Sequence, residues 1–178
     1  HEDRRVQHAG VVLGYDGSAT HAHALKLSDP HIHPELATLR EVSAVTAACM
    51  MLRRETFAEI GGFDEAFPIG FNDTDLCLRL RARGYRILQD NTTILLHHES
   101  RTRRTTGQWL HPPDTALFQA RHAALIQAGD PFYNPNLRLS VQDHELRPDC
   151  LPGGPPRITF PAPAPTPPGA TPAAPPTP

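Results

Sequence analysis

Apolar residues along the chain gather in short segments that polar and glycine-rich stretches separate. Val6 to Leu13 (VQHAGVVL) is apolar and β-branched and ends at Gly14, which predicts a strand. Val42 to Leu52 (VSAVTAACMML) is the most apolar segment, and its first half favours a second strand. Tyr15 to Arg40, between these two segments, is rich in Gly, Ser, Asp, His and Pro and indicates a long loop.

Helical periodicity follows in three places. Residues 54 to 60 carry apolar side chains on one helical face, and Gly61-Gly62 supplies a helix stop. A second helix is predicted from Asp73, as its cap, to about Arg83, with Leu76, Cys77 and Leu80 as its apolar face. Leu117 to Ala128 is predicted to form a third helix.

Two further short strands are predicted, Tyr85 to Leu88 and Thr93 to Leu96, on either side of a turn at Asp90-Asn91. Strands and helices therefore alternate along the chain. This alternation predicts an α/β fold, with helices packed on a largely parallel sheet.

The prolines divide the chain of 178 residues into two parts. About a dozen of the 20 prolines lie between Pro152 and Pro178, and such a segment cannot sustain a helix or a sheet ladder. Residues 151–178 are therefore predicted to be a disordered Pro/Ala-rich tail. Residues 1–150 form the candidate globular part, which is long enough for one modest core.

Charge, hydropathy and cysteine usage exclude several classes of function. A net charge of -2 and a pI near 6.6 argue against a nucleic-acid-binding surface. No segment approaches the run of about 18 apolar residues that a membrane span requires. The three cysteines are odd in number and widely spaced, which favours reduced thiols in a cytoplasmic protein.

Eleven histidines are an unusual number, and four of them form two alternating pairs. These pairs are His21/His23 and His31/His33. Alternate residues of a strand point the same way, so each pair could chelate a metal ion. A polar surface loop with incidental histidines explains the same pattern, and the sequence leaves both interpretations open.

An acidic cluster marks the start of the second predicted helix, at Asn72-Asp73-Thr74-Asp75. The helix dipole favours negative charge at this position. A carboxylate that projects from a loop–helix junction into a cleft can act as a general base. Simple N-capping by Asp73 is the alternative.

Two other clusters could also carry chemistry. His97-His98-Glu99-Ser100 follows a predicted strand, where ligand sites of α/β sheets lie, and could bind a metal or phosphate or be an ordinary surface pair. Gly61-Gly62-Phe63-Asp64-Glu65 combines close backbone approach with carboxylates that could hold sugar hydroxyls. A helix stop and a turn would explain the second segment equally well.

The order of these clusters is more specific than any one of them. Cys49 to Glu65 (CMMLRRETFAEIGGFDE), Asn72 to Arg86 (NDTDLCLRLRARGYR) and His97 to Ser100 (HHES) resemble, in this order, the C-terminal half of a family 2 glycosyltransferase of the GT-A fold. Val6 to Gly14 and Asp130 to Asn136 (DPFYNPN) are similar to segments of its bacterial cell-surface polysaccharide and rhamnosyltransferase-like members. The resemblance covers the chain from about Val6 to Leu146.

The resemblance implies transfer of a sugar from a nucleotide-sugar donor to a saccharide acceptor, with inversion of the anomeric centre. The acceptor hydroxyl must lose a proton as it attacks, which calls for a carboxylate base. The acidic pair of the family maps onto Asn72-Asp73, so Asp73 is the expected base with Asp75 beside it. Asn72 stands where the family has an acid, which leaves one carboxylate at the pair.

The resemblance also implies further site residues and a divalent metal, Mg²⁺ or Mn²⁺. His97 matches the position that supplies a histidine to the metal or diphosphate, and Arg101 or Arg103 would contact the diphosphate. The loop expected to line the acceptor and donor sugar comprises Gly62, Phe63, Asp64 and Glu65.

The Asp-x-Asp metal motif and the nucleotide-binding strand of the family belong to its N-terminal half, which this stretch of sequence is expected to lack. The expected partner of this chain is therefore the N-terminal half of a parent domain in the cytoplasm, or peripheral at the inner membrane, and the 178-residue piece alone is expected to be inactive. The alternative function is a non-catalytic carbohydrate- or partner-binding remnant of the GT-A fold.

Overall fold

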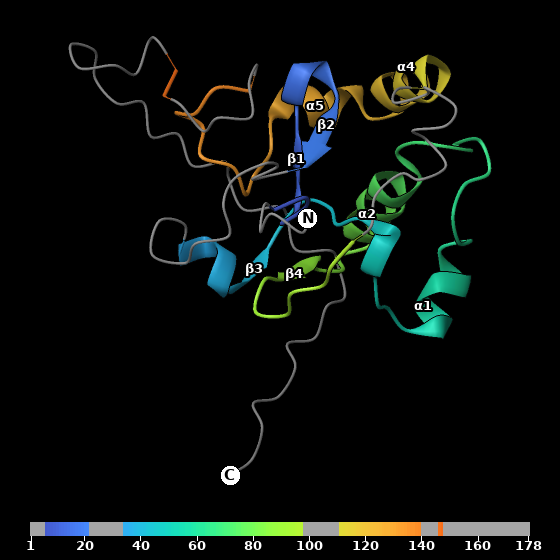
Figure 1. Ribbon diagram of the computed structural model, residues 1–178. Helices are drawn as coiled ribbons and strands as arrows, with labels where there is room; N and C mark the ends of the chain where they lie inside the picture. Colours follow the sequence, from blue (N-terminus) through green and yellow to red (C-terminus); the bar gives the residue numbers. More distant parts are fainter. Residues whose placement is uncertain (1–5, 22–33, 98–110, 140–145, 148–178) are drawn as a thin grey trace.

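The computed structural model describes residues 6–21, 34–97, 111–139 and 146–147 of the chain (Figure 1). Short strands alternate with helices. The helices are α1 (Arg54–Glu59), α2 (Asn72–Ala82), α4 (Pro112–Arg121) and α5 (Ala123–Ala128), with 3-10 helices η1 (Tyr15–Gly17), η2 (Pro34–Ala37) and η3 (Ala47–Cys49). The strands are β1 (Val11–Leu13), β2 (Ala19–His21), β3 (Leu39–Glu41) and β4 (Leu88–Asp90).

The described strands form two antiparallel pairs, β1 with β2 and β3 with β4. The Gly14 N–H donates to Ser18 O at 2.7 Å and closes a tight hairpin between β1 and β2, and such a short connection permits only antiparallel pairing. Val11 N donates to Ala44 O, and Val42 N to Ile87 O, so that residues 42–44 connect the two pairs. The predicted α/β class is confirmed, whereas the largely parallel sheet is wrong for the described strands.

Most predicted helices are present, with shifted boundaries. The helices predicted at residues 54–60 and from Asp73 to Arg83 are α1 and α2. The helix predicted from Leu117 to Ala128 is wrong as a single element, because it is split at His122 into α4 and α5 and begins earlier, at Pro112. Proline is well accommodated in the first turn of a helix, since its missing N–H has no partner there in any case.

The strand predictions were less accurate. The predicted strand from Thr93 to Leu96 is wrong, because these residues form no ladder and the Ile94 side chain is 84% exposed. The strand predicted from Tyr85 to Leu88 lies instead at Leu88–Asp90. The segment predicted as one long loop, residues 15–40, contains β2 and the start of β3.

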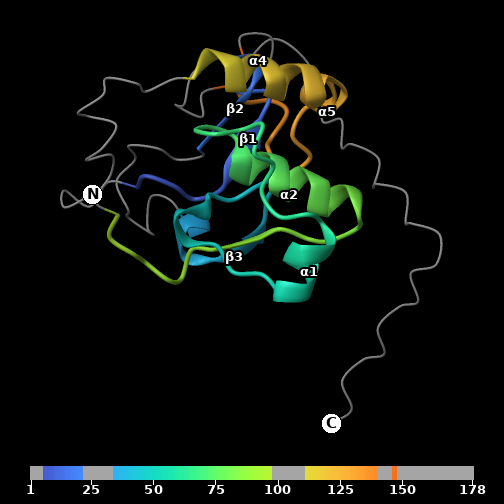
Figure 2. The same ribbon diagram turned by 90° about the vertical axis from the view of Figure 1, so that its right-hand side faces the viewer.

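Helix α2 lies at the centre of the core. Figure 2 shows it between α4 and α5 on one side and α1 on the other. Leu76, Cys77 and Leu80 pack in one buried cluster with Val11 and Val42, which confirms the predicted apolar face. Leu78 faces the opposite way and packs in a second cluster, whose buried members are Leu13, Phe67, Leu78 and Phe118. A helix that is buried on two sides needs apolar residues around its circumference, so this one lacks a single apolar stripe.

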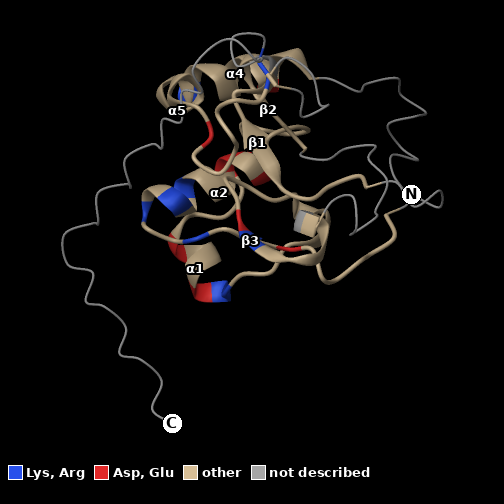
Figure 3. Ribbon diagram, turned by 90° about the vertical axis from the view of Figure 1, so that its left-hand side faces the viewer, with Lys and Arg blue, Asp and Glu red and all other residues tan. Residues whose placement is uncertain are grey.

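Charged residues along α2 follow the helix dipole. Asp73 and Asp75 lie in its first turn, and Arg79 and Arg81 lie in its last. Figure 3 shows the acidic segments at the start of this helix and the basic segments toward its end. Each sign of charge thus lies at the end of the helix where the dipole stabilises it.

A half-buried carboxylate, Asp130, joins the chain after α5 to the first strand. Its Oδ2 accepts a hydrogen bond from Leu13 N at 2.8 Å, and its Oδ1 accepts one from Phe132 N at 2.8 Å. Burial raises the pKa of Asp130, although these hydrogen bonds oppose the rise. The turn that begins at Asp130, closed by Tyr133 N donating to Asp130 O, is therefore anchored directly to the first strand.

Other predictions concern segments only partly within the structure. Across the described ranges, no helix is long and apolar enough to cross a membrane. Cys49 is exposed and Cys77 is buried, and both are free thiols. Cys150 and the predicted Pro-rich tail, residues 151–178, lie outside the described residues.

Gly10 generates a stability prediction, because it has φ +106° and a Cβ added to it would lie 2.9 Å from Val42 Cγ1. Gly10→Ala should lower the free energy of unfolding through both backbone strain and overlap with a buried side chain. Gly61→Ala is the matched control, since φ is +81° there but a Cβ would meet nothing within 4 Å. We expect a loss of about 1–2 kcal/mol for Gly61→Ala and about 1–3 kcal/mol more for Gly10→Ala in urea unfolding. Equal losses would contradict the predicted overlap.

Candidate functional site

The residue before α2 has an unusual backbone conformation. Phe71 has φ 62°, the one positive φ at a non-glycine residue in the described part of the chain. A bulky side chain rarely occupies this region, and it does so only where its surroundings hold it. The Phe71 ring stacks on Phe118 with ring centroids 4.5 Å apart, and its carbonyl accepts a hydrogen bond from Asp75 N at 2.7 Å. These contacts fix the direction in which the chain enters the helix.

Asp73 lies in the first turn and is not the N-cap, which is Phe71. The capping alternative for Asp73 is therefore wrong. Its Oδ2 accepts a hydrogen bond from Ala47 N at 3.0 Å, and its Oδ1 accepts one from Thr74 N at 2.7 Å. A carboxylate has about four lone-pair positions, so these bonds fix its orientation and leave capacity to accept another proton donor.

Asp73 faces a cavity of about 160 Å³. Phe71, Val11 and Ile69 give this cavity an apolar side. Its polar lining comes from β2, the start of α2 and the start of α4: Thr20, His21, Asp73, Thr74, His111 and Thr115. A half-buried carboxylate at the wall of such a pocket has the placement that a general base requires.

A half-buried histidine, His8, supports the loop that contacts Asp73. His8 Nε2 accepts hydrogen bonds from Gly10 N at 3.3 Å and from Thr46 N at 3.2 Å. Burial, and then the neighbouring His21, lower the pKa of His8 to about 3, so its ring is neutral at pH 7. His8 thus holds Thr46 and, through it, the Ala47 N–H that orients the carboxylate of Asp73.

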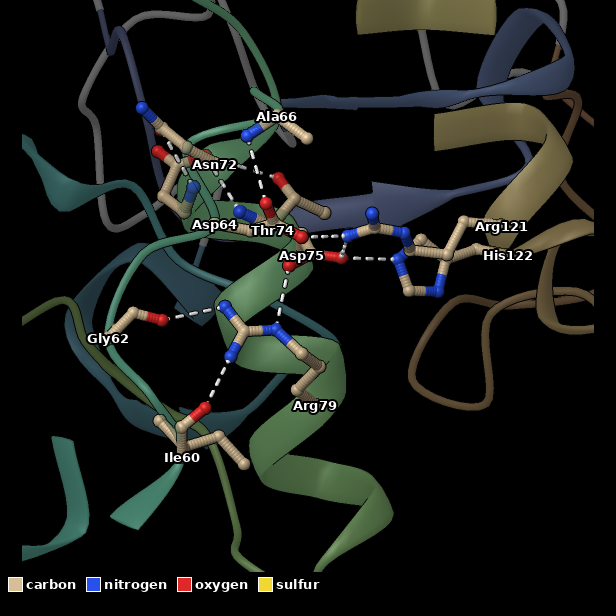
Figure 4. Close-up of polar contacts among 11 residues, drawn as sticks. Ile60, Gly62, Asp64, Ala66, Asn72, Thr74, Asp75, Arg79, Arg121 and His122 are labelled. Atoms are coloured by element: carbon tan, nitrogen blue, oxygen red, sulfur yellow. Dashed lines mark hydrogen bonds and ion pairs between the residues drawn. The ribbon is translucent and has the colours of Figure 1, made fainter. Parts of the chain in front are cut away.

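The second carboxylate of the motif, Asp75, has a different environment (Figure 4). Its side chain is 0% exposed. Oδ2 accepts from Arg79 Nε at 2.7 Å, whereas Oδ1 lies 2.9 Å from His122 Nε2 and 3.1 Å from Arg121 Nη1. The carboxylate of Asp75 is thus engaged within the protein, and it does not line the cavity.

The same network holds the glycine-rich loop. Arg79 donates through Nη1 to Ile60 O and through Nη2 to Gly62 O, both at 2.8 Å. Arg121 Nη1 donates to Asp64 Oδ2 at 2.6 Å. The two arginines that pair with Asp75 therefore also tie this loop to α2 and α4, as Figure 4 shows.

The predicted acceptor-side residues lie beside this network and away from the cavity. Phe63 packs edge-on against Phe57, with ring centroids 5.4 Å apart, and Glu65 is exposed. Asn72 lies next to the pocket, where its Oδ1 accepts from Asp73 N at 2.8 Å. Asn72 is thus hydrogen-bonded to Asp73 beside the pocket. The loop residues predicted with them do not line the cavity: Gly62, Phe63, Asp64 and Glu65.

His97, the predicted metal ligand, is exposed after β4. Its Nδ1 lies 2.7 Å from Gln7 Oε1, and the Gln7 carbonyl lies 3.3 Å from His21 Nδ1 at the cavity. With Nδ1 donating to an oxygen, Nε2 is left as a nitrogen that can coordinate a metal, which is the usual arrangement of ligating histidines.

Other predicted ligands cannot be placed. Arg101, Arg103, His23, His31 and His33 lie outside the described residues. Within residues 6–21, 34–97, 111–139 and 146–147, no three His, Cys, Asp or Glu side chains gather in a metal-binding group.

Sequence reasoning missed His111 and Phe71, which line the cavity, and Asp114, which lies behind His111. His111 and Asp114 lie at a helix start well after the motifs, so no local pattern linked them to Asp73. A His followed three positions later by an Asp at a proline-marked helix start was the only available signal.

Asp75 leads to a prediction of pH-dependent stability. Burial alone would raise its pKa, but hydrogen bonds from His122, Arg79 and Arg121 outweigh this effect and lower the pKa to about 2. Because the unfolded value is about 3.9, the ionised carboxylate stabilises the fold above pH 4, and this contribution is lost as pH falls toward 2. Asp75→Asn should cost about 1.5–3 kcal/mol at pH 7, because it replaces charge-assisted hydrogen bonds to two partly exposed arginines and His122 with weaker ones.

The measurement is urea unfolding of the wild type and the Asp75→Asn variant between pH 7 and 2, where the difference should shrink below pH 4. Glu59→Gln, which breaks the exposed Arg83–Glu59 pair, is the control and should change stability by less than about 1 kcal/mol. A difference between wild type and the Asp75→Asn variant that stays constant with pH would contradict the assignment.

Three relatives place the chain among known proteins. Over 151 residues, 80% of the chain, it is 41% identical to the O-antigen biosynthesis protein RfbC of Myxococcus xanthus, of which it covers 11%. It is 39% identical over 155 residues to the uncharacterised protein y4gI of Sinorhizobium fredii, covering 16% of that protein. Half of the chain is 33% identical to an N-acetylglucosaminyl-diphospho-decaprenol L-rhamnosyltransferase of Mycobacterium tuberculosis, of which it covers 30%.

No family model matches the chain, and no solved structure matches it significantly. The chain spans about 11–30% of the length of these curated relatives. The resemblance predicted from the ordered motifs is confirmed: the chain is similar to part of a rhamnosyltransferase-like glycosyltransferase.

Proposed function

We propose that this chain is the acceptor-side part of an inverting glycosyltransferase that builds a cell-surface polysaccharide. The parent enzyme transfers a sugar from a nucleotide-sugar donor to a saccharide acceptor. The observation that carries the proposal is Asp73, whose oriented, half-buried carboxylate lines a pocket with polar and apolar sides. The similarity to an O-antigen biosynthesis protein and to a rhamnosyltransferase supports this proposal.

The proposed chemistry needs one base on the acceptor side. The acceptor hydroxyl attacks the anomeric carbon of the donor, its proton passes to Asp73, and the bond to the nucleoside diphosphate breaks on the opposite face. The hydrogen bonds from Ala47 N and Thr74 N keep the carboxylate in one orientation, so little reorganisation is needed when the proton moves. Asn72 adds no second negative charge, and its side chain accepts from the backbone N–H of Asp73. Asp75 is a positioning residue in this proposal and not part of the catalytic pair.

The parent enzyme also needs positive charge at the departing diphosphate. A bound Mg²⁺ or Mn²⁺ would supply it by neutralising the diphosphate oxygens. His97 fits such a role through its Nε2, and Arg101 and Arg103 remain candidates for diphosphate contacts. A single histidine cannot hold the ion, so the other ligands, including an Asp-x-Asp motif, are proposed to come from the N-terminal half of the parent.

The names of two relatives suggest substrate classes for the parent. One is an O-antigen biosynthesis protein, and the other is an L-rhamnosyltransferase named for N-acetylglucosaminyl-diphospho-decaprenol. We propose L-rhamnose as the first donor sugar to test and a lipid-linked saccharide as the acceptor. An acceptor of this kind would bring the parent enzyme to the cytoplasmic face of the inner membrane.

The base assignment is tested by Asp73→Asn in the full-length parent. Asparagine keeps an oxygen that can accept a backbone hydrogen bond, so the fold should survive. Transfer of radiolabelled sugar from nucleoside-diphospho-L-rhamnose should fall by about 10²–10⁴-fold in kcat. Glu55→Gln makes the same chemical change at an exposed position of α1 and should leave kcat unaltered. Normal turnover by the Asp73→Asn variant would show that another group is the base.

The proposal that donor binding needs a further part of the parent is tested by assaying the 178-residue chain beside the full-length parent. The 178-residue chain alone should release no nucleoside diphosphate from the donor, because the donor-binding half is proposed to lie elsewhere. Adding the separately expressed N-terminal half should restore some turnover. Turnover by the piece alone would overturn this proposal, and a parent that binds saccharides without any turnover would favour the non-catalytic remnant.

A further inference from the structure

The lining of the cavity that holds Asp73 also includes a histidine, paired with an aspartate, that the proposed chemistry does not use. His111 precedes α4 and lines the cavity. Its Nδ1 lies 2.8 Å from Asp114 Oδ1, one turn further along the helix, and the Asp114 side chain is only 2% exposed. A nearly enclosed carboxylate therefore lies directly behind the ring, on the side of Nδ1.

Asp114 also holds the loop that leads to Asp73. Its Oδ2 accepts hydrogen bonds from Gly70 N at 2.7 Å and from Ile69 N at 3.1 Å. Burial alone would raise the pKa of Asp114, but the hydrogen bonds from Gly70 N and Ile69 N and the neighbouring His111 ring lower it, so the group is a carboxylate at pH 7. One ionised side chain thus contacts both the histidine and the two peptide groups before Phe71.

By contacting both His111 and the backbone at Ile69 and Gly70, Asp114 sets the spacing between the side of the pocket that carries His111 and the side that carries Asp73. Phe71 is held at a strained positive φ between the Asp114-bound peptides and the helix that begins with Asn72 and Asp73. Strain of this kind persists only where several contacts determine the backbone, and it concentrates at ligand sites. His111 and Asp73 are therefore fixed relative to each other through Asp114 and the turn at Phe71.

The pocket itself indicates the kind of ligand. Its volume of about 160 Å³ lies below the roughly 300–1,000 Å³ of pockets for drug-sized ligands, so it suits one small unit. Its lining combines hydroxyl, imidazole and carboxylate groups with the apolar surfaces of Phe71, Val11 and Ile69. A monosaccharide has this character, with hydroxyls around its edge and C–H groups on its faces.

We propose that His111 is a substrate-binding residue, which contacts a hydroxyl of the acceptor monosaccharide through Nε2 and thereby turns a neighbouring hydroxyl toward Asp73. Asp114 is the positioning residue that fixes both the imidazole and the Phe71 turn. The inference rests on the proposed function for the identity of the reaction, but the binding of a saccharide to this pocket does not. His111 would then select which acceptor hydroxyl is glycosylated.

The test distinguishes a role of the His111 Nε2 atom in sugar binding from a role of its Nδ1 atom in pairing with Asp114. A Gln side chain can place its amide nitrogen near the position of Nε2, whereas an Asn side chain places a polar atom near that of Nδ1. If Nε2 contacts the sugar, His111→Gln should keep part of the affinity, while His111→Asn and His111→Ala should lose at least about tenfold, the effect of one lost hydrogen bond. If His111 serves only to pair with Asp114, the order of Gln and Asn reverses, and the proposal is overturned.

The measurement uses the full-length parent and a panel of octyl glycosides that covers hexoses, 6-deoxyhexoses and N-acetylhexosamines. Dissociation constants from ligand-observed NMR report binding without any turnover, and Glu55→Gln controls for the effect of an unrelated surface change. In kinetic assays, His111 variants should raise the acceptor KM and leave the donor KM and acceptor-free donor hydrolysis unchanged. Asp114→Asn should lower kcat for acceptor transfer with the same donor parameters.

The outcomes distinguish the two proposals. If Asp73→Asn abolishes transfer while every His111 variant keeps the wild-type acceptor affinity, the role of His111 is wrong and the glycosyltransferase function stands. If the parent turns over no nucleotide-sugar but binds a glycoside through His111, the pocket assignment stands and the proposed reaction is wrong. Absence of binding by every glycoside of the panel would overturn the pocket assignment itself.

Discussion

The other contacts of the site depend on the ion pairs and hydrogen bonds that the buried carboxylate of Asp75 accepts. This carboxylate is fully enclosed and accepts from two arginines and a histidine that come from α2, α4 and the α4–α5 junction. Those arginines reach onward to Ile60, Gly62 and Asp64, so that one charge organises a loop and three helical segments. An ion buried without such partners would be strongly unfavourable, and for this reason the segments must assemble together.

The two carboxylates of the motif have opposite roles because of helix geometry. Residues two apart on an α-helix point about 200° from each other, so Asp73 and Asp75 cannot face the same space. Asp75 points toward α4 and takes the charged partners, whereas Asp73 contacts the loop at Ala47 and lines the cavity. The pair that looks like one acidic cluster in the sequence is therefore one positioning group and one candidate base.

The sequence predicted what depends on local pattern and missed what depends on long-range contact. The helices over 54–60 and after Asn72 follow from periodicity and a glycine stop, and both are present. The run Ile94-Leu95-Leu96 has strand-like composition, but no ladder forms there and its side chains are exposed, since β-propensity depends on packing partners. The cap at Asp73 failed because Phe71 adopts a left-handed conformation, which only tertiary contacts could impose. No pattern in the sequence indicated His111 and Asp114, because only tertiary contacts bring them close to Asp73.

Helix α4 holds the pocket and the ion pairs around Asp75 in fixed positions relative to each other. At its start, His111 lines the cavity and Asp114 lies behind it, and at its end Arg121 and His122 contact Asp75. Between them Phe118 is completely buried against Phe71, so the helix cannot slide without breaking an ion network, a ring stack and the bonds to Gly70 together. A site built on a helix that is held at both ends is placed more precisely than one on a loop, because each anchor restricts the movement that the other allows. The proposed acceptor pocket is thus built on the same element that neutralises the buried charge, and its shape is inseparable from the stability of the fold.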